Sequence, residues 1–236
     1  KLITKTIAIL FVATIFTSCS IDMFNRVNGN RNVITKQRKA SNDFNGIKVS
    51  TGIDLYISQG NSNKITVEAD ENLHDIIMTE VEDGVLKVYS EKSIWRAKAR
   101  KVYVTVKKLN SLKATSGSDV YGEDVIKTDE ISIYATSGAD IRISVDAISV
   151  ETSSTSGSDI KISGKSTNHA SSATSGASID AYNLESKNVI AKATSGADIN
   201  IYASEMLEAK ATSGADIDFK GNPAKVNKKS SSGGDV

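Results

Sequence analysis

The sequence is poor in the residues that build compact chemical sites. Its 236 residues include one cysteine, one proline and two histidines. A single cysteine excludes an intrachain disulfide and a cysteine-based metal cluster, and the scarcity of proline excludes a proline-rich linker. Lys and Arg number 29 against 28 Asp and Glu, a balance that lacks the basic footprint of nucleic-acid binding. We therefore expect no nucleic-acid partner.

Catalytic patterns are also missing. His74 and His169 lie far apart in the sequence and belong to no Ser-His-Asp or Cys-His pattern, so we expect both on the surface. The recurring TSGAD phrase lacks the lysine and the strand-to-helix context that a phosphate-binding loop needs. The sequence predicts neither an enzyme nor a cofactor.

The N-terminus carries the features of an export signal. Residues 7–16 (IAILFVATIF) follow Lys1 and Lys5 and form an apolar run too short to span a bilayer as a helix, which indicates a signal peptide. The sequence FTSC at 16–19 resembles the lipobox of bacterial lipoproteins, although Phe16 stands where leucine is usual. An ordinary signal peptide that happens to contain a cysteine is the alternative. The resemblance implies a signal peptide at 1–18, lipidation of Cys19 and a bacterial outer-membrane lipoprotein, with its surface or periplasmic orientation left open.

The next segment has a different composition. Residues 20–40 are rich in Asn, Arg and Lys and show no apolar period. This composition favours a flexible tether, so we expect residues 19–41 to be the lipidated cysteine and a tether, and residues 42–236 to be one folded domain.

The folded domain begins with strand patterns. Residues 46–58 place Ile53, Leu55 and Ile57 on one face by alternation. Residues 76–90 contain two apolar runs joined at Asp83-Gly84, a dipeptide that supplies the positive φ of a tight hairpin.

A repeat governs the sequence from residue 111 onward. ATSGAD occurs three times, at 135–140, 193–198 and 211–216, with close variants at 114, 154 and 173. The glycines of these motifs recur every 18 to 21 residues, at 117, 138, 157, 176, 196, 214 and 233. A period in this range is typical of a solenoid whose units stack on one another.

The side-chain period identifies the kind of solenoid. Within residues 207–219 the apolar residues alternate with polar ones, and Ser213 shares the parity of Ala211 and Ala215. This period of two has no helical half-unit and predicts an all-β, single-stranded parallel β-helix of about 19 residues per coil, stacked about 4.8 Å apart. The parity predicts that the motif serine points inward.

Stacked motifs align equivalent residues into rows. One predicted row is acidic and consists of Asp119, Asp140, Asp159, Asp198, Asp216 and Asp235, with Ser178 in one place. Like charges one coil apart repel, so solvent, turn amides, nearby lysines or a bound cation must relieve them. The row is the only candidate metal site, and it departs from the calcium-binding nonapeptide pattern in period and glycine count. We favour solvated or turn-capping aspartates.

One stretch outside the repeat is a candidate for ligand binding. Residues 93–101 (SIWRAKARK) hold the only tryptophan, Trp95, beside Arg96, Lys98 and Arg100. Aromatic and cationic groups on a loop suit contacts with carbohydrate, anionic polymer or protein. The alternative is a tryptophan that covers the core.

Three stretches together resemble a known family. They are FNGIKVSTGIDLYISQGNSNKITVEADENL, TEVEDGVLKVYS, and the serial ATSGAD motifs that end in GNPAKVNKKSSSGGDV. Over residues 40–236 the chain resembles the head GIN domain of putative auto-transporter adhesins, common among Bacteroidetes lipoproteins. The resemblance implies a right-handed β-helix and an adhesin-like role, and it supplies no catalytic or ligand residues.

The sequence therefore predicts a lipid-anchored envelope protein with an adhesin-like binding or structural role. Its expected partners are the membrane, through the N-terminal lipid, and a cell-surface glycan or protein. Two alternatives remain open: a periplasm-facing scaffold or sensor, and a β-helix protein that binds or degrades polysaccharide.

Overall fold

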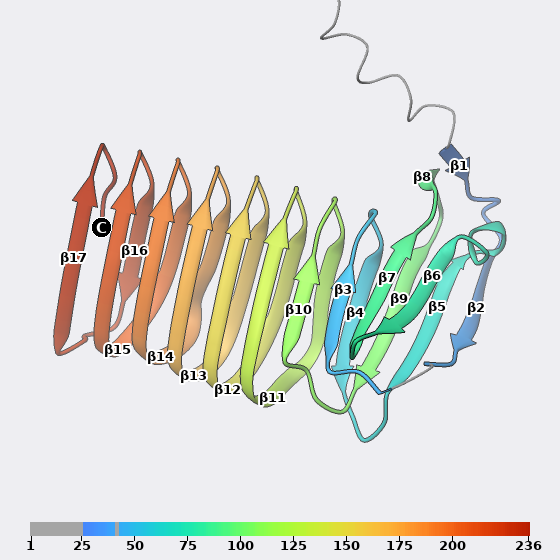
Figure 1. Cartoon of the computed structure of the whole chain (residues 1–236), viewed down its shortest axis with the longest axis horizontal. Coiled ribbons are helices and arrows are strands. Elements are labelled where there is room, and N and C mark those ends of the chain that lie inside the picture. The colour runs from blue at the N-terminus through green and yellow to red at the C-terminus, as the bar shows by residue number, and fades with distance from the viewer. Residues whose placement is uncertain (1–25, 41–42) are drawn as a thin grey trace, which may run out of the picture.

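The structure, a computed structural model, describes residues 26–40 and 43–236 and is a right-handed parallel β-helix (Figure 1). In Figure 1 the chain runs up the front strands, over an apex and down the rear strands, and moves to the left with each coil. The predicted fold is confirmed, with about six turns of about 19 residues.

The repeated coils pair in parallel with their neighbours, front strand on front strand and rear on rear. Strands β11 to β15 each run down the rear, around a lower corner and up the front without a break. The elements of this region are β10 (Ser111–Ala114), β11 (Asp119–Thr136), β12 (Asp140–Thr155), β13 (Asp159–Thr174), β14 (Ser178–Thr194), β15 (Asp198–Thr212), β16 (Asp216–Lys220) and β17 (Lys225–Ser231).

The apex is a two-residue turn in which both residues have positive φ. Ser213 has φ 57° and Gly214 has φ 69°, and both are exposed. The prediction of an inward serine is therefore wrong, because alternation does not continue through a left-handed turn; Ala211 and Ala215 on either side are both buried. The turns also stack, since each motif glycine from Gly117 to Gly214 donates its N–H to the serine carbonyl of the next coil at 3.1 to 3.3 Å, as Gly214 does to Ser232.

The core consists of inward rows that repeat from coil to coil. The residue directly after the turn glycine is buried in every turn from Gly117 to Gly214, and two places later a branched aliphatic side chain is at most 2% exposed. Stacked aliphatic residues pack against one another in the narrow interior. This aliphatic row consists of Val120, Ile141, Ile160, Ile179, Ile199 and Ile217.

Differences in coil length are absorbed away from the apex. The first repeat has 21 residues, and its extra residues form a bulge between Tyr121 and Val125, where the pairing of β11 with β12 shifts register. Register shifts in β13 and β14 also lie toward the end of the rear strand. Because the bulges lie between the rear strand and the front strand, the turns remain aligned in every coil.

An N-terminal cap closes one end of the solenoid. Strands β3 (Gly46–Val49) and β4 (Asp54–Gln59) form a coil whose turn, at Thr51 and Gly52, has the same positive φ values as the repeats. β7 (Val85–Ser90) and β9 (Arg100–Val106) stack in parallel on that coil, and the antiparallel strands β6 (Ile77–Glu82) and β5 (Lys64–Asp70) lie outside them. The predicted hairpin at Asp83-Gly84 is confirmed by its positive φ values.

The expected tether is wrong for residues 26–40, which are part of the folded unit. β1 (Arg26–Asn28) pairs in parallel with β8 (Ser93–Arg96), and β2 (Val33–Arg38) pairs antiparallel with β5. The residues lack an apolar period because β2 is an edge strand with none of its side chains buried, so its stability comes from main-chain pairing.

The last coil differs from the others at its inward positions. Lys228 stands in register with the buried Ala209, and its ammonium lies 4.5 Å from the centre of the Phe219 ring. The same ammonium donates to the Val236 carbonyl at 3.1 Å. An inward lysine at an edge opposes the addition of another strand.

Candidate functional site

The loop around Trp95 replaces the two-residue turn at the apex of the capping coil. Trp95 is 55% exposed and lies outside the core, which excludes the prediction's alternative of a core lid. The guanidinium carbon of Arg26 lies 4.5 Å from the centre of the indole ring, a cation–π contact that joins β1 to the loop.

The candidate residues Trp95, Arg96, Lys98 and Arg100 all border one surface hollow of about 790 Å³. Residues that sequence reasoning missed complete its rim, because they come from distant segments. They are Asn28, Gly29, Arg31 and Asp54, whereas Ala97, Ala99 and Lys101 belong to the predicted stretch 93–101.

A buried carboxylate fixes the base of this loop. Asp70, fully buried at the end of β5, accepts hydrogen bonds from the amides of Arg31 at 2.9 Å, Lys98 at 3.1 Å and Ala99 at 3.0 Å. Burial alone would raise the pKa of Asp70, but these amides and the charge of Lys98 outweigh it and lower the pKa. Gly29 is required here, since an added Cβ would lie 1.9 Å from the Asp70 carboxylate. The loop is therefore held in place.

The predicted acidic row exists and begins earlier than the sequence indicated. Asp54 lies in register with the row through the pairing of β4 with β11, and Asp216 pairs with Asp235 at the other end. Asp119, Asp140, Asp159, Ser178, Asp198 and Asp216 follow in register. Asp54 was missed because its motif, STGID, differs in letters from TSGAD while its turn has the same backbone.

The electrostatics of the row show the expected repulsion. Burial, and then the charge of Asp140, raise the pKa values of Asp119 and Asp159. Burial also raises the pKa of Asp54, against the opposing charges of Arg100 and Lys101. Within residues 26–40 and 43–236, no three acidic, histidine or cysteine side chains converge as a metal-binding group. In the same part of the chain, the carboxylates of the row from Asp119 through Asp216 accept no hydrogen bond from a turn amide, so they do not cap the turns.

A second like-charge row runs along the front face and was not noticed in the sequence. Lys192, Lys210 and Lys229 stand in register on adjacent front strands, each exposed. None forms an ion pair with a residue that the structure describes. The signal was present, since the sequence AKAT recurs at 191–194 and 209–212. Like charges directly opposite one another destabilise a sheet, so the row has an energetic cost within the fold.

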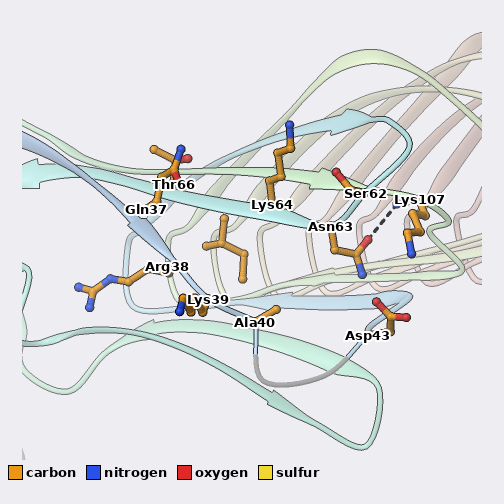
Figure 2. Close-up of a pocket in the computed structure, with 11 residues that line it drawn as sticks. Gln37, Arg38, Lys39, Ala40, Asp43, Ser62, Asn63, Lys64, Thr66 and Lys107 are labelled. Atoms are coloured by element: carbon orange, nitrogen blue, oxygen red, sulfur yellow. Dashed lines mark hydrogen bonds between the residues drawn. The ribbon is translucent and has the colours of Figure 1, made fainter.

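A further hollow, of about 830 Å³, lies beside the end of β2 and is lined by Arg38, Lys39, Lys64 and Lys107 (Figure 2). The amide of Lys107 donates to Asn63 at 3.0 Å across it. Figure 2 shows the charged ends of Arg38 and Lys64 pointing in different directions. The cations do not converge on one point, so the hollow is not a defined anion site.

The expectation that both histidines lie on the surface is wrong. His74 and His169 are each 2% exposed. The Nε2 atom of His169 lies 2.9 Å from the hydroxyl of Thr152 in the interior of the solenoid, and the Nε2 atom of His74 lies 3.1 Å from the Ile34 carbonyl. Polar residues at inward positions made the segment around His169 look like a surface strand.

Some predictions fall outside the described residues, namely the signal peptide at 1–18 and the lipidated Cys19. Within the part of the chain that is described, no helix has the length and apolar character needed to cross a membrane.

Comparisons with solved structures show the same fold. The chain is similar to a putative adhesin from Bacteroides fragilis, with 23% identity, a TM-score of 0.83, and coverage of 89% of this chain and 98% of that one. A putative adhesin from Parabacteroides merdae has 24% identity and a TM-score of 0.69, with coverage of 90% and 99%. A putative lipid binding protein from Parabacteroides distasonis has 20% identity and a TM-score of 0.73, with coverage of 89% and 99%.

No curated protein matches the chain. A family model does, over residues 43–223, and it is described as "putative auto-transporter adhesin, head GIN domain". The family and these three structural relatives are described as putative adhesins or putative lipid binding proteins and not as enzymes. The match to this family indicates a cell-envelope or surface protein. The chain belongs to the head GIN domain family of putative auto-transporter adhesins.

Proposed function

We propose that this protein is a lipid-anchored, non-enzymatic adhesin-like component of the cell envelope that binds an acidic cell-surface polymer along its front face. The β-helix is the scaffold, and the row of Lys192, Lys210 and Lys229 is the binding surface.

The lysine row carries the proposal. Its three ammonium groups repeat at the coil spacing of about 4.8 Å and have no ion-pair partner among the described residues. Folding gains nothing from placing like charges opposite one another, whereas a linear polyanion would neutralise several of them at once. An acidic glycan is such a polymer and fits the expected partner class.

The anchoring part of the proposal rests on the lipobox-like FTSC sequence and on Cys19. Family membership indicates the envelope, and one structural relative is described as a putative lipid binding protein, which is compatible with a protein that works beside a membrane. Palmitate labelling of cells that express the full chain tests this step, and Cys19→Ala should abolish incorporation.

Binding is tested with the chain from Ser20, without lipid, on an immobilised acidic polysaccharide. Lys192→Gln with Lys210→Gln should weaken binding about tenfold, the effect of two exposed charge pairs, and added salt should weaken wild-type binding. Lys127→Gln with Lys165→Gln is the matched control, because it removes two lysines that Asp146 separates in register. Equal losses in the two double variants would contradict the proposed surface.

Orientation is tested by protease treatment of intact cells, with a periplasmic protein as control. Cleavage of the domain while the control survives is expected for an adhesin-like protein. Protection until the envelope is opened would replace adhesion by a periplasmic scaffold or sensor role. Turnover of a glycan by the purified domain would contradict the non-enzymatic assignment.

A further inference from the structure

The loop around Trp95 carries an exposed aromatic ring and exposed cations. We propose that it docks on the anionic headgroup surface of the membrane that holds the protein's own lipid. The inference rests on the proposed lipidation of Cys19, and it concerns a different surface from the lysine row.

The first argument is the length of chain between the anchor and the loop. Arg26 follows Cys19 by seven residues, and a chain extends by at most about 3.5 Å per residue, so Arg26 lies within roughly 25 Å of the lipidated residue. Arg26 in turn lies against Trp95, with its guanidinium carbon 4.5 Å from the ring centre. The anchor therefore confines the loop to the neighbourhood of the headgroups.

The second argument is the chemistry of the exposed side chains. Residues 91–99 carry Lys92, Arg96 and Lys98 against the single exposed carboxylate of Glu91. Basic groups beside a membrane are attracted to anionic lipids, and an indole ring prefers the headgroup region because it combines an apolar body with a polar N–H.

The third argument is that the surface is preformed. The Asp70 carboxylate binds amides from both the β1–β2 connection and the loop, at Arg31, Lys98 and Ala99. The parallel pairing of β1 with β8 adds a second link, in register from Arg26 with Ser93. Docking then requires little ordering of the chain, which lowers its entropic cost.

Trp95 is the only tryptophan of the chain, so its fluorescence reports on this loop alone. The experiment uses the unlipidated chain from Ser20, which retains every strand of the structure, and phosphatidylcholine vesicles with or without phosphatidylglycerol. With phosphatidylglycerol we expect a blue shift of the emission, quenching by brominated acyl chains and co-sedimentation. Arg96→Gln with Lys98→Gln should weaken vesicle binding about thirtyfold, since each basic residue near the surface contributes roughly fivefold.

The matched control is Lys192→Gln with Lys210→Gln, which should leave vesicle binding unchanged. Both pairs are exposed, so neither double variant should melt below the wild-type temperature. Unchanged Trp95 emission with phosphatidylglycerol vesicles at low salt would overturn the inference, as would loss of vesicle binding in the front-face variant alone. Glycan binding without vesicle binding would refute docking and leave the proposed function intact, and vesicle binding without glycan binding would do the reverse.

Discussion

Replacing the buried His169 is expected to change how the stability of the solenoid depends on pH. His169 lies on the front strand of β13, where its register neighbours are Val150 and Val189. Its Nδ1 atom has no hydrogen-bond partner, and its Nε2 atom lies 2.9 Å from the Thr152 hydroxyl. The substitution His169→Val places a third valine in this row and removes the titrating group.

The magnitude follows from the pKa of the buried ring. Burial lowers the pKa of His169 from 6.5 to about 4. The unfolded chain therefore takes up the proton first, so the stability is intact above pH 6.5 and is lost as the pH falls toward about 4. Each unit between the two pKa values corresponds to about 1.4 kcal/mol, which gives a total loss of about 3 kcal/mol, of which about 2 kcal/mol is lost by about pH 5.

The assay is urea unfolding of the wild type and the His169→Val variant at about pH 7.5 and about pH 5. The free energy of unfolding of the variant relative to the wild type should rise by about 2 kcal/mol between the two conditions, with equal m-values. Carboxylates such as Asp54 and Asp119 titrate in both proteins, so their contribution cancels in the comparison. A difference that does not change with pH would refute the reasoning.

Three further predictions concern the apex turn, the hydrogen bonds of Asp70 and the C-terminal edge strand. Gly214→Ala should cost roughly 1 to 2 kcal/mol, for its positive φ alone, because an added Cβ there meets nothing within 4 Å; Gly164→Ala should cost more than about 3 kcal/mol, because its Cβ would lie 1.9 Å from the Val145 carbonyl oxygen. Equal decreases in melting temperature for the two glycine variants would contradict the close contact of Gly164 with the Val145 carbonyl. Asp70→Ala leaves three amides without an acceptor, so trypsin should cleave the Trp95 loop faster than in the wild type. An unchanged cleavage rate would show that the hydrogen bonds of Asp70 do not hold the loop. Lys228→Val should produce end-to-end association that grows with concentration in sedimentation experiments, whereas a purely monomeric variant would remove the protective role of the lysine.

The fold was predictable because two periods agree in the sequence. The 19-residue repeat predicts stacking, and the alternation around residues such as Ile217 predicts strands, so a parallel β-helix satisfies both. The inward serine was mispredicted at Ser213 because alternation carries no information about a left-handed turn. Residues 26–40 were mispredicted because an edge strand such as β2 is held by main-chain hydrogen bonds, which leave no apolar pattern.

The candidate site was predictable only in part. Trp95 and its neighbouring cations stood out by composition, but Arg26, Arg31 and Asp70 reach the loop through pairings between distant strands. The burial of His169 depends on its register with valines of two other coils. Such information lies in the three-dimensional pairing and not in local sequence.

The regular apex explains where a binding surface can arise on this fold. The Ser–Gly turns hold the same backbone in every coil, while changes in coil length fall in the lower corner. Any residue type at a fixed distance from the turn therefore becomes a row along the solenoid, at intervals of about 4.8 Å. The lysine of AKAT, two residues before the threonine at Lys192 and Lys210, becomes such a row without any change in the backbone. Because the stacked turns and the aliphatic core already hold the coils in register, this like-charge row contributes nothing that folding requires, which is the reason we propose a partner of opposite charge for it.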